Sequence, residues 1–140
     1  MVMTVHVDIV SAEKEIFSGL AEMVFAPAEL GEVGITPRHA PFITRLKPGE
    51  VRVKISESES HPYYVSGGML EVQPHLVTIL ADTAIRAKDI DEAAAIEAKA
   101  KAEEALADKS GKIDYATAQA QLAEAIMQLR TLDRLRKRGG

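Results

Sequence analysis

Residues 76–98 read LVTILADTAIRAKDIDEAAAIEA, and the character of the chain changes within them. Two short apolar runs of strand length, Leu76–Ala81 and Ala84–Arg86, give way to a stretch rich in alanine. The same change divides the whole chain, because all 11 valines and all 6 prolines precede position 78, whereas 13 of the 21 alanines follow Lys88. Valine favours strands, proline interrupts helices and alanine is the best helix former. We therefore predict a β domain over residues 1–88 and a helical domain over residues 89–140.

Apolar and polar residues alternate with a period of two in the first domain. Val5, Val7 and Ile9 share one face of residues 4–11, which is typical of a half-buried strand. Further runs of strand length are 20–26, 42–46, 50–56, 63–66, 69–73, 76–81 and 84–86. Turn signals between them are Ser18 with Gly19, Pro48 with Gly49, residues 56–61, Gly67 with Gly68, and Pro74 with His75. These short, closely spaced strands predict an antiparallel sandwich or flattened barrel.

Two helices are expected after residue 88. Asp89 and Glu92 resemble a capping box that opens a helix running to about Asp108, and Asp114 caps a second helix. The second helix carries apolar residues at three-four spacing: Tyr115, Ala118, Leu122, Ala125, Leu129 and Leu132. The first helix offers Ala93, Ile96, Ala100 and Ala107 to meet them. A short turn makes the pair an antiparallel hairpin. Because an alanine in place of a leucine forgoes roughly 2 kcal/mol of burial per site, we expect a loosely held, mobile arm.

Composition limits the class of protein. The chain has 140 residues, 46% hydrophobic and 27% charged, with a formal net charge of −4, as in a soluble globular protein. No run approaches the roughly 18 apolar residues of a membrane span, and residues 1–10 alternate in polarity, unlike a signal peptide. We therefore expect a cytoplasmic protein. The mild negative charge argues against general nucleic-acid binding.

Patterns that carry catalysis or metal binding are missing from the sequence. The chain has no cysteine, which excludes thiol nucleophiles, thiolate zinc sites and disulfides. His6, His39, His61 and His75 stand on separate segments without a second ligand at metal spacing. No nucleophile elbow, Walker loop or dinucleotide fingerprint occurs. We therefore expect no catalytic residue, no metal and no cofactor.

Residues 31–41, GEVGITPRHAP, form a dense segment of glycine and proline. One interpretation is a rigid connection, in which glycines adopt positive φ and prolines fix the turns. The other is a docking loop that presents Glu32 and His39 from a stiff platform. The residues themselves leave both interpretations open.

The end of the chain is basic. Arg130, Arg134, Arg136, Lys137 and Arg138 stand against the single acid Asp133, a net charge of +4, whereas residues 89–129 carry −5. Cations in a last helical turn interact favourably with the helix dipole, and this explains two or three of them. Five cations indicate an acidic partner surface.

Several motifs together resemble the epsilon subunits of bacterial F-type ATP synthases. They are the 31–41 segment, YVSGG at 64–68, LEVQP at 70–74 and LADTA at 80–84. The similarity covers essentially the whole chain, including the alanine-rich helix and the basic end. It implies a ten-stranded sandwich at the foot of the central stalk, followed by a helical hairpin. A subunit of this family couples proton-driven rotation to ATP synthesis without catalysing a reaction itself.

The resemblance also implies partners and a place. The sandwich would bind the gamma subunit and the c-ring through Gly31, Glu32, Gly34, Arg38, His39 and Pro41, with Glu32 at the c-ring and His39 near gamma. The hairpin would fold against the sandwich or extend into the alpha and beta subunits, where its basic end meets an acidic stretch of beta and blocks ATP hydrolysis. The complex alone would hold the protein at the cytoplasmic face of the inner membrane.

Two departures from the family pattern bear on function. Position 38 is commonly glycine and is Arg38 here. Members that bind regulatory ATP carry an arginine where this chain has Ala94, and Thr117, Glu124 and Gln128 replace further basic groups. Asp91 remains from that motif as the weak candidate contact, and Arg86 would serve only in a different pose. We expect weak ATP binding or none. A free-standing ligand-sensing module is the alternative function.

Overall fold

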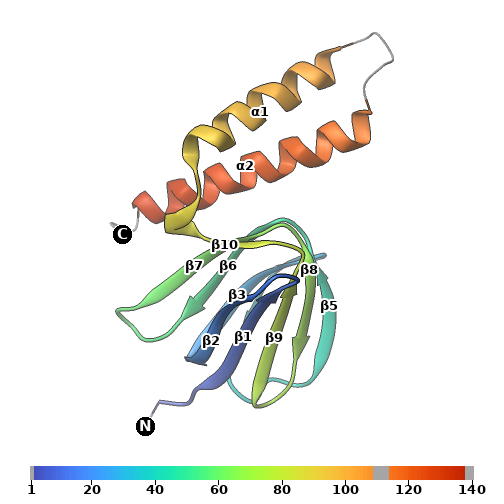
Figure 1. Cartoon of the computed structure of the whole chain (residues 1–140). Coiled ribbons are helices and arrows are strands. Elements are labelled where there is room, and N and C mark those ends of the chain that lie inside the picture. The colour runs from blue at the N-terminus through green and yellow to red at the C-terminus, as the bar shows by residue number, and fades with distance from the viewer. Residues whose placement is uncertain (1, 109–113, 138–140) are drawn as a thin grey trace. The chain divides into compact units, whose positions relative to one another are not determined.

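A computed structural model describes residues 2–108 and 114–137, which belong to two compact units that divide between Arg86 and Ala87 (Figure 1). The first unit holds β1 (Val5–Ser11), β2 (Glu15–Ala21), β3 (Met23–Ala28), β4 (Gly31–Ile35), β5 (Phe42–Leu46), β6 (Gly49–Lys54), β7 (Ser60–Val65), β8 (Gly68–Val72), β9 (Leu76–Ala81) and β10 (Ala84–Arg86). The second holds a 3-10 turn η1 (Ala87–Asp89), α1 (Glu92–Ala107) and α2 (Tyr115–Lys137). The predicted fold class, a ten-stranded β domain followed by a helical hairpin, is confirmed.

The strands run in the order β10-β7-β6-β3-β5-β8-β9-β1-β2, with β4 paired to β3. Neighbours are antiparallel in every pair except β1 and β9, which are parallel from His6 with Leu76 to Ser11 with Ala81. Consecutive strands such as β1 and β2 are joined by a short turn and must be antiparallel, whereas β1 and β9 are separated by most of the β domain, which leaves their direction unconstrained. Hydrophobic alternation carries no information on direction, so the sequence did not reveal this pair.

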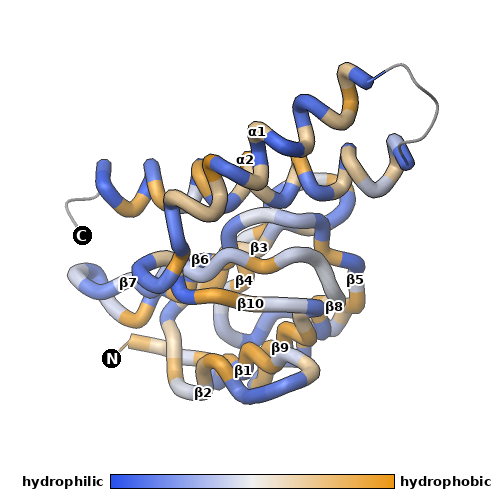
Figure 2. Tube along the Cα trace, turned by 45° about the horizontal axis from the view of Figure 1, so that its top comes forward, coloured by the Kyte–Doolittle hydropathy of each residue, from blue (hydrophilic) through white to orange (hydrophobic). Residues whose placement is uncertain are grey.

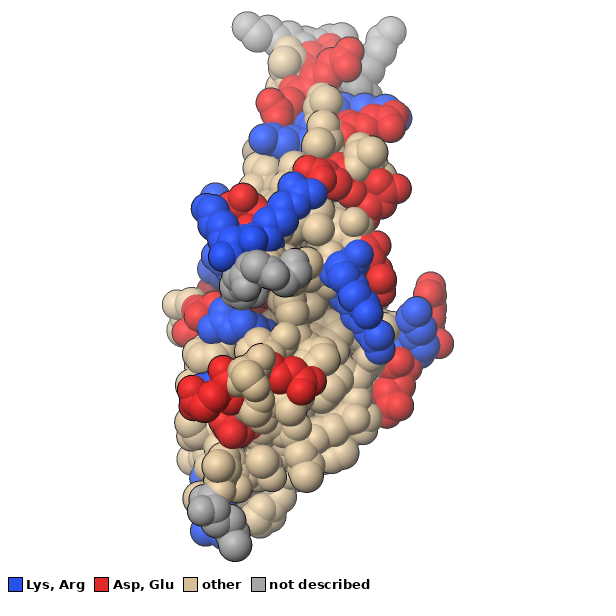
Figure 3. Space-filling view, turned by 90° about the vertical axis from the view of Figure 1, so that its left-hand side faces the viewer, with Lys and Arg blue, Asp and Glu red and all other residues tan. Residues whose placement is uncertain are grey.

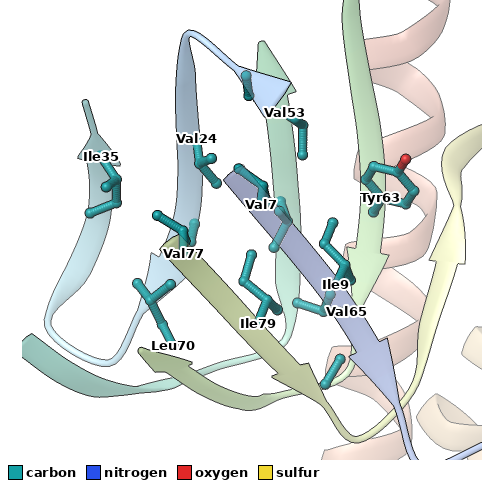
Figure 4. Packing of buried hydrophobic residues seen from close by; sticks show 14 of the residues in the cluster. Val7, Ile9, Val24, Ile35, Val53, Tyr63, Val65, Leu70, Val77 and Ile79 are labelled. Carbon is teal, nitrogen blue, oxygen red and sulfur yellow. The ribbon is translucent and has the colours of Figure 1, made fainter. Parts of the chain in front are cut away.

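Inward-facing side chains of the strands form one hydrophobic core (Figure 4). In β1 the inward residues are Val5, Val7 and Ile9, as their alternation predicted, and β9 contributes Val77 and Ile79. Branched side chains suit this pleated, close-packed interior. Burying each contributes about 1.5–3 kcal/mol. This core fixes the surfaces that the outward-facing residues present.

The structure corrects one strand and one turn near the N-terminus. Residues 20–26 are not one strand, because β2 ends at Ala21 and β3 begins at Met23. Ser18 and Gly19 are not a turn but pair with Asp8 and Val7 inside β2. A Cβ added at Gly19 would lie 3.3 Å from the Phe17 ring, so the glycine gives that ring space. The sequence analysis took Gly19, a glycine inside a strand, for a turn residue.

Helix α1 begins two residues later than its capping pattern indicated. Asp89 ends η1, and Asp91 is the N-cap, its Oδ1 accepting the Ala94 N–H at 3.1 Å. Asp114 caps α2 as predicted, accepting N–H groups from Ala116 and Thr117 at 3.1 and 3.2 Å. The predicted short turn between the two helices falls on residues 109–113, which lie outside the described residues.

The helix seam is predicted correctly on α2 except at its first residue, and wrongly on α1. On α2, Ala118, Ala125 and Leu132 are buried and Leu122 and Leu129 are half-buried, but the predicted Tyr115 is 41% exposed. On α1, the predicted Ala93, Ile96, Ala100 and Ala107 are exposed, and the seam runs instead through Glu92, Ala95, Lys99, Ala102 and Leu106. The buried face of α1 therefore consists of small alanines, one leucine and two charged residues. Figure 2 shows few strongly hydrophobic residues along α1. Because the faces of α1 differ little in hydrophobicity, the sequence shows no apolar stripe that identifies the buried face.

Candidate docking surfaces

The segment singled out as a docking loop is half strand. Gly31–Ile35 is β4, paired with β3 from Ala28 with Gly31 to Val24 with Ile35. Gly31 adopts φ 138°, which allows the tight turn from β3. A Cβ on Gly34 would lie 2.7 Å from the end of the Met23 side chain and 3.3 Å from Phe25, so a larger residue here would have to displace these two side chains. The two predicted interface glycines therefore shape the surface and offer no side chain to a partner.

Glu32 and Leu30 project from the β3–β4 hairpin. Both are exposed, and Leu30 is entirely so at 102%. They border a hollow of about 360 Å³ whose other lining residues include Val33, Phe42 and Ile43. Glu32 is its one ionisable lining residue. A shallow apolar hollow with one carboxylate fits a partner segment that brings an apolar side chain and a hydrogen-bond donor.

Residues 36–41 form a rigid connection between β4 and β5. The Arg38 N–H donates to the Pro74 carbonyl at 2.9 Å, which ties the connection to the β8–β9 turn. Arg38 has φ 62°, alone among the non-glycine residues that the structure describes. His39 Nδ1 lies 2.8 Å from the Ala40 carbonyl, which assigns the proton to Nδ1, and its ring lies 5.3 Å from that of Phe42. Arg38 and Pro41 are exposed, whereas His39 is half-buried.

Outward residues of three neighbouring strands form an exposed apolar patch that the sequence analysis missed, and it is interrupted by the outward Arg45 and Glu71, which pair with Met69 and Ile43. Ile43 is 64% exposed, Met69 37% and Leu80 51%. Met69 pairs directly with Leu80, which in turn pairs with the outward Val10. The apolar residues at outward positions of β5, β8 and β9 were the signal in the sequence from which this patch could have been predicted. Apolar side chains gathered on one exposed face can mark a protein interaction site.

A serine, a histidine and an aspartate meet on the outer face of β1 and β2. His6 Nε2 lies 2.9 Å from Asp8 Oδ1 and 3.0 Å from Ser18 Oγ, and the Ser18 hydroxyl donates to Asp8 Oδ1 at 2.7 Å. A catalytic triad needs one imidazole nitrogen for the acid and the other for the serine. Here one nitrogen meets both, so the cluster lacks the geometry of a proton relay. Residues 2–108 and 114–137 also hold no group of three potential metal ligands.

The basic end of α2 is partly neutralised within the hairpin. Arg136 makes a two-pronged ion pair with Glu92 of α1, with Nη1 at 3.1 Å from Oε1. This hydrogen bond lowers the pKa of Glu92 and raises the pKa of Arg136. Lys137 pairs with Asp133 at 3.1 Å. Figure 3 shows basic and acidic side chains side by side along the helices. Arg138 lies outside the described residues.

The candidate nucleotide contacts already have structural partners. The Asp91 carboxylate caps α1, and Ala94 contributes its backbone N–H to that cap. In the β unit, the Arg86 guanidinium lies 3.5 Å from the Ile16 carbonyl. Burial raises the pKa of the neighbouring Tyr63, and the Arg86 charge opposes this shift. Within the described residues, Asp91 and Arg86 are thus already engaged in contacts that hold the fold.

The fold defines a protein of two parts, a ten-stranded sandwich and a helical hairpin. Residues 4–87 match the β-sandwich domain of the ATP synthase delta/epsilon chain, and residues 88–133 match its long alpha-helix domain. The chain belongs to this family, as its motifs indicated.

Curated relatives extend over the full length. The ATP synthase epsilon chain of Nitrosococcus oceani is 69% identical over 100% of both chains. ATP synthase epsilon chain 1 of Methylococcus capsulatus is 72% identical over 98% of each. Among solved structures, a chain of the Euglena gracilis mitochondrial ATP synthase superposes with a TM-score of 0.83 at 18% identity, covering 92% of this chain and 81% of that one. A chain of the Tetrahymena thermophila enzyme gives 0.61 at 12%, with 93% and 97% covered.

Proposed function

We propose that this chain is a noncatalytic rotor subunit in the central stalk of a bacterial proton-translocating ATP synthase. It couples proton-driven rotation to ATP synthesis and restrains ATP hydrolysis through its hairpin. The observation that carries the proposal is the end-to-end identity of 69% to an ATP synthase epsilon chain. The stiff, densely hydrogen-bonded sandwich supports it, because a joint that transmits torque needs a multipoint grip and no reactive group.

The sandwich is the docking part of this proposal. Its apolar patch of Ile43, Met69 and Leu80 would bind the gamma subunit, and the connection around Arg38 and His39 would border that contact. The β3–β4 hairpin would meet the polar loops of the c-ring through Glu32. An apolar centre with charged neighbours suits a long-lived protein interface. Gly31, Gly34 and Pro41 act by shaping the backbone.

The hairpin is the regulatory part. Its seam buries alanine for the most part, so little free energy opposes an exchange of its contacts. We infer that it reaches the alpha and beta subunits and that its basic end binds acidic groups of beta. This contact would hinder hydrolysis while the sandwich stays bound to the rotor.

Membrane association follows from the complex in this proposal. Among the described helices, none has the length and apolar character to cross a membrane. The protein would lie peripherally at the cytoplasmic face of the inner membrane, held by gamma and the c-ring. A free-standing ligand sensor remains the alternative, and copurification with gamma distinguishes the two.

The test is complementation of membranes depleted of this subunit. A variant ending at Lys88 keeps every strand. It should bind gamma and restore ATP synthesis as the full chain does, while ATP hydrolysis rises because the hairpin is gone. Loss of gamma binding by a folded sandwich would contradict the proposal. The full chain is the matched control, and circular dichroism checks the fold of the shortened one.

A further inference from the structure

A second hollow, of about 370 Å³, lies where the YVSGG segment (64–68) and the LADTA segment (80–84) meet. It is lined by the end of β5, the turn between β7 and β8, and the first residue after β9. Arg45 and Asp82 are its two charged lining residues, and both are exposed. Among the described residues, neither has an ion-pair or hydrogen-bond partner for its side chain. Two opposite charges thus border one hollow without neutralising each other.

Hydrogen bonds hold the wall of this hollow in place. The Thr83 N–H and the Thr83 hydroxyl both donate to Ser66 Oγ, at 2.9 and 2.7 Å, and the Asp82 N–H donates to the Gly67 carbonyl at 2.9 Å. Gly67 has φ 128°, and a Cβ there would lie 3.2 Å from Asp82 Oδ2, so the carboxylate lies close against the turn. Because Ser66 Oγ already accepts two bonds, its own proton is left to donate. The hollow therefore offers a positioned carboxylate and hydroxyl together with the longer guanidinium of Arg45.

This hollow borders the apolar patch of Ile43, Met69 and Leu80. Met69 belongs to both, and Arg45 is its direct partner in the antiparallel pair of β5 and β8. A partner that covers the patch would therefore also reach Arg45 and Asp82. Ligand pockets bury most of a small molecule, whereas these two charged side chains are exposed. The hollow consequently fits a segment of a protein partner better than a free small molecule.

The two charges select different groups on such a segment. The guanidinium of Arg45 binds a carboxylate in a bidentate manner, and the Asp82 carboxylate binds an ammonium or a guanidinium group. The complementary segment thus carries one acidic and one basic side chain, in the order set by Arg45 and Asp82. A charge that is covered without a counter-charge loses hydration and gains nothing in return. A partner that docks in another orientation is therefore disfavoured.

We propose that Arg45 and Asp82 fix the orientation in which the gamma subunit covers the apolar patch, by forming ion pairs with an acidic and a basic side chain of one gamma segment. This inference rests on the proposed function. The apolar patch supplies contact area, but hydrophobic burial is non-directional and leaves the partner free to shift. Two opposite charges at one border of the patch add the missing direction, because only one docking orientation neutralises both.

Reversing the two charges separates specific contacts from net charge. In the full chain, Arg45→Glu and Asp82→Lys each reverse one charge, and the double variant R45E/D82K exchanges them while the net charge stays −4. Each variant is titrated into a complex of alpha, beta and gamma that lacks this subunit. A single reversal should weaken binding about tenfold, and the exchanged variant about a hundredfold, because both positions then face like charges. An exchanged variant that binds as tightly as the unmodified chain would overturn the inference.

Neutral variants supply matched controls. Arg45→Ala and Asp82→Asn should each weaken binding about two- to fivefold, with the larger effect at low salt. Lys47→Ala and Glu13→Gln remove the same charges from exposed positions that do not line the hollow, and they should bind as the unmodified chain does. Equal losses in these controls would show that overall charge alone steers gamma, which would overturn the inference. Asp82→Asn preserves the shape of the side chain, and thermal unfolding checks that every variant is folded.

The outcomes separate this inference from the function on which it rests. If the unmodified chain does not bind gamma, the proposed function fails and the inference fails with it. If Met69→Ser weakens binding while every Arg45 and Asp82 variant binds normally, the inference alone is overturned. Variants that bind gamma normally but no longer attach to the c-ring in depleted membranes would identify the c-ring as the occupant and would also overturn it.

Discussion

The sandwich and the hairpin bury different kinds of side chain. The core of the sandwich is built from branched residues such as Val7, Val24 and Ile79, all fully buried. The buried positions of the hairpin are Ala95, Ala102, Ala118, Ala125, Thr131 and Leu132. Since burial free energy scales with apolar area, each alanine contributes far less than a valine or isoleucine. One chain thus combines a part suited to permanent docking with a part suited to changing partners.

Truncating a core residue of the sandwich should have the largest effect. Leu70 is fully buried in β8, next to Ile79 of β9. We expect Leu70→Ala to lower the free energy of unfolding by about 2–5 kcal/mol, because it removes apolar contacts and leaves a cavity. Urea denaturation measures this change. Met69→Ala is the control, since Met69 faces outward and should mainly weaken binding to gamma. Equal destabilisation by both changes would contradict the assigned faces of β8.

Enlarging the hairpin seam tests its corrected register. Ala102 is 1% exposed, whereas Ala100 is exposed on the same helix. Ala102→Leu should destabilise the hairpin by about 1–3 kcal/mol through overpacking, and Ala100→Leu should be nearly neutral. Hydrogen exchange in α1 reports the difference without requiring global unfolding. If Ala102→Leu were neutral and Ala100→Leu disruptive, the buried face of α1 would contain Ala100, as the sequence analysis predicted.

The difference between branched buried residues in the sandwich and alanines in the hairpin also explains which elements could be predicted from the sequence. In β1, alternating valine and isoleucine identify both the strand and its buried face, because every inward position is apolar. In α1, Ile96 is the largest apolar residue of the first turns and is 53% exposed, whereas Lys99 lies in the seam. Alanine fits both faces of a helix, so only its partner fixes the register.

Of the candidate docking surface, one part could be predicted from the sequence and the other could not. Glycine and proline in residues 31–41 marked a shaped segment, and the structure adds that Gly34 lies close against the side chains of Met23 and Phe25. The apolar patch escaped notice because Ile43, Met69 and Leu80 are far apart in the sequence. They meet only through the order β5-β8-β9, which depends on tertiary pairing.

Relieving backbone strain in the sandwich should have a smaller effect, of opposite sign. Arg38 adopts φ 62°, a conformation that costs roughly 1–2 kcal/mol for a residue with a side chain. Arg38→Gly should therefore stabilise the protein by up to about 1 kcal/mol, after the greater entropy of the unfolded glycine is subtracted. Thermal unfolding measures the shift. Arg38→Ala keeps the strain and serves as the control, and equal stability of both variants would contradict the strained conformation.

Acid should weaken the hairpin before the sandwich. Hydrogen bonding to Arg136 lowers the pKa of Glu92 from its ordinary 4.5, and bonds from the Thr117 hydroxyl and backbone lower the pKa of Asp114. Each carboxylate therefore stabilises the folded hairpin above its unfolded pKa, and this contribution is lost as pH falls through the lower folded pKa. Relative to the intrinsic exchange rate at each pH, the protection of the α1 and α2 amides should fall below about pH 4.5, and Glu92→Gln should reduce that pH dependence. An unchanged profile in Glu92→Gln would exclude the pair as its source.

The smallest measured effect should be the heat of ATP binding, because the hairpin residues that could hold ATP already cap a helix. The Asp91 carboxylate accepts the Ala94 N–H, and position 94 has no guanidinium to match phosphate charge. Glu124 would add repulsion if α2 faced a triphosphate. Calorimetric titration of the full chain with ATP and magnesium should therefore give no heat up to millimolar concentration. Ala94→Arg is the informative comparison, since it restores a fork of donors in the first turn of α1 without removing the cap. Micromolar binding by the unmodified chain, abolished by Asp91→Ala, would show that the capping carboxylate also serves a ligand.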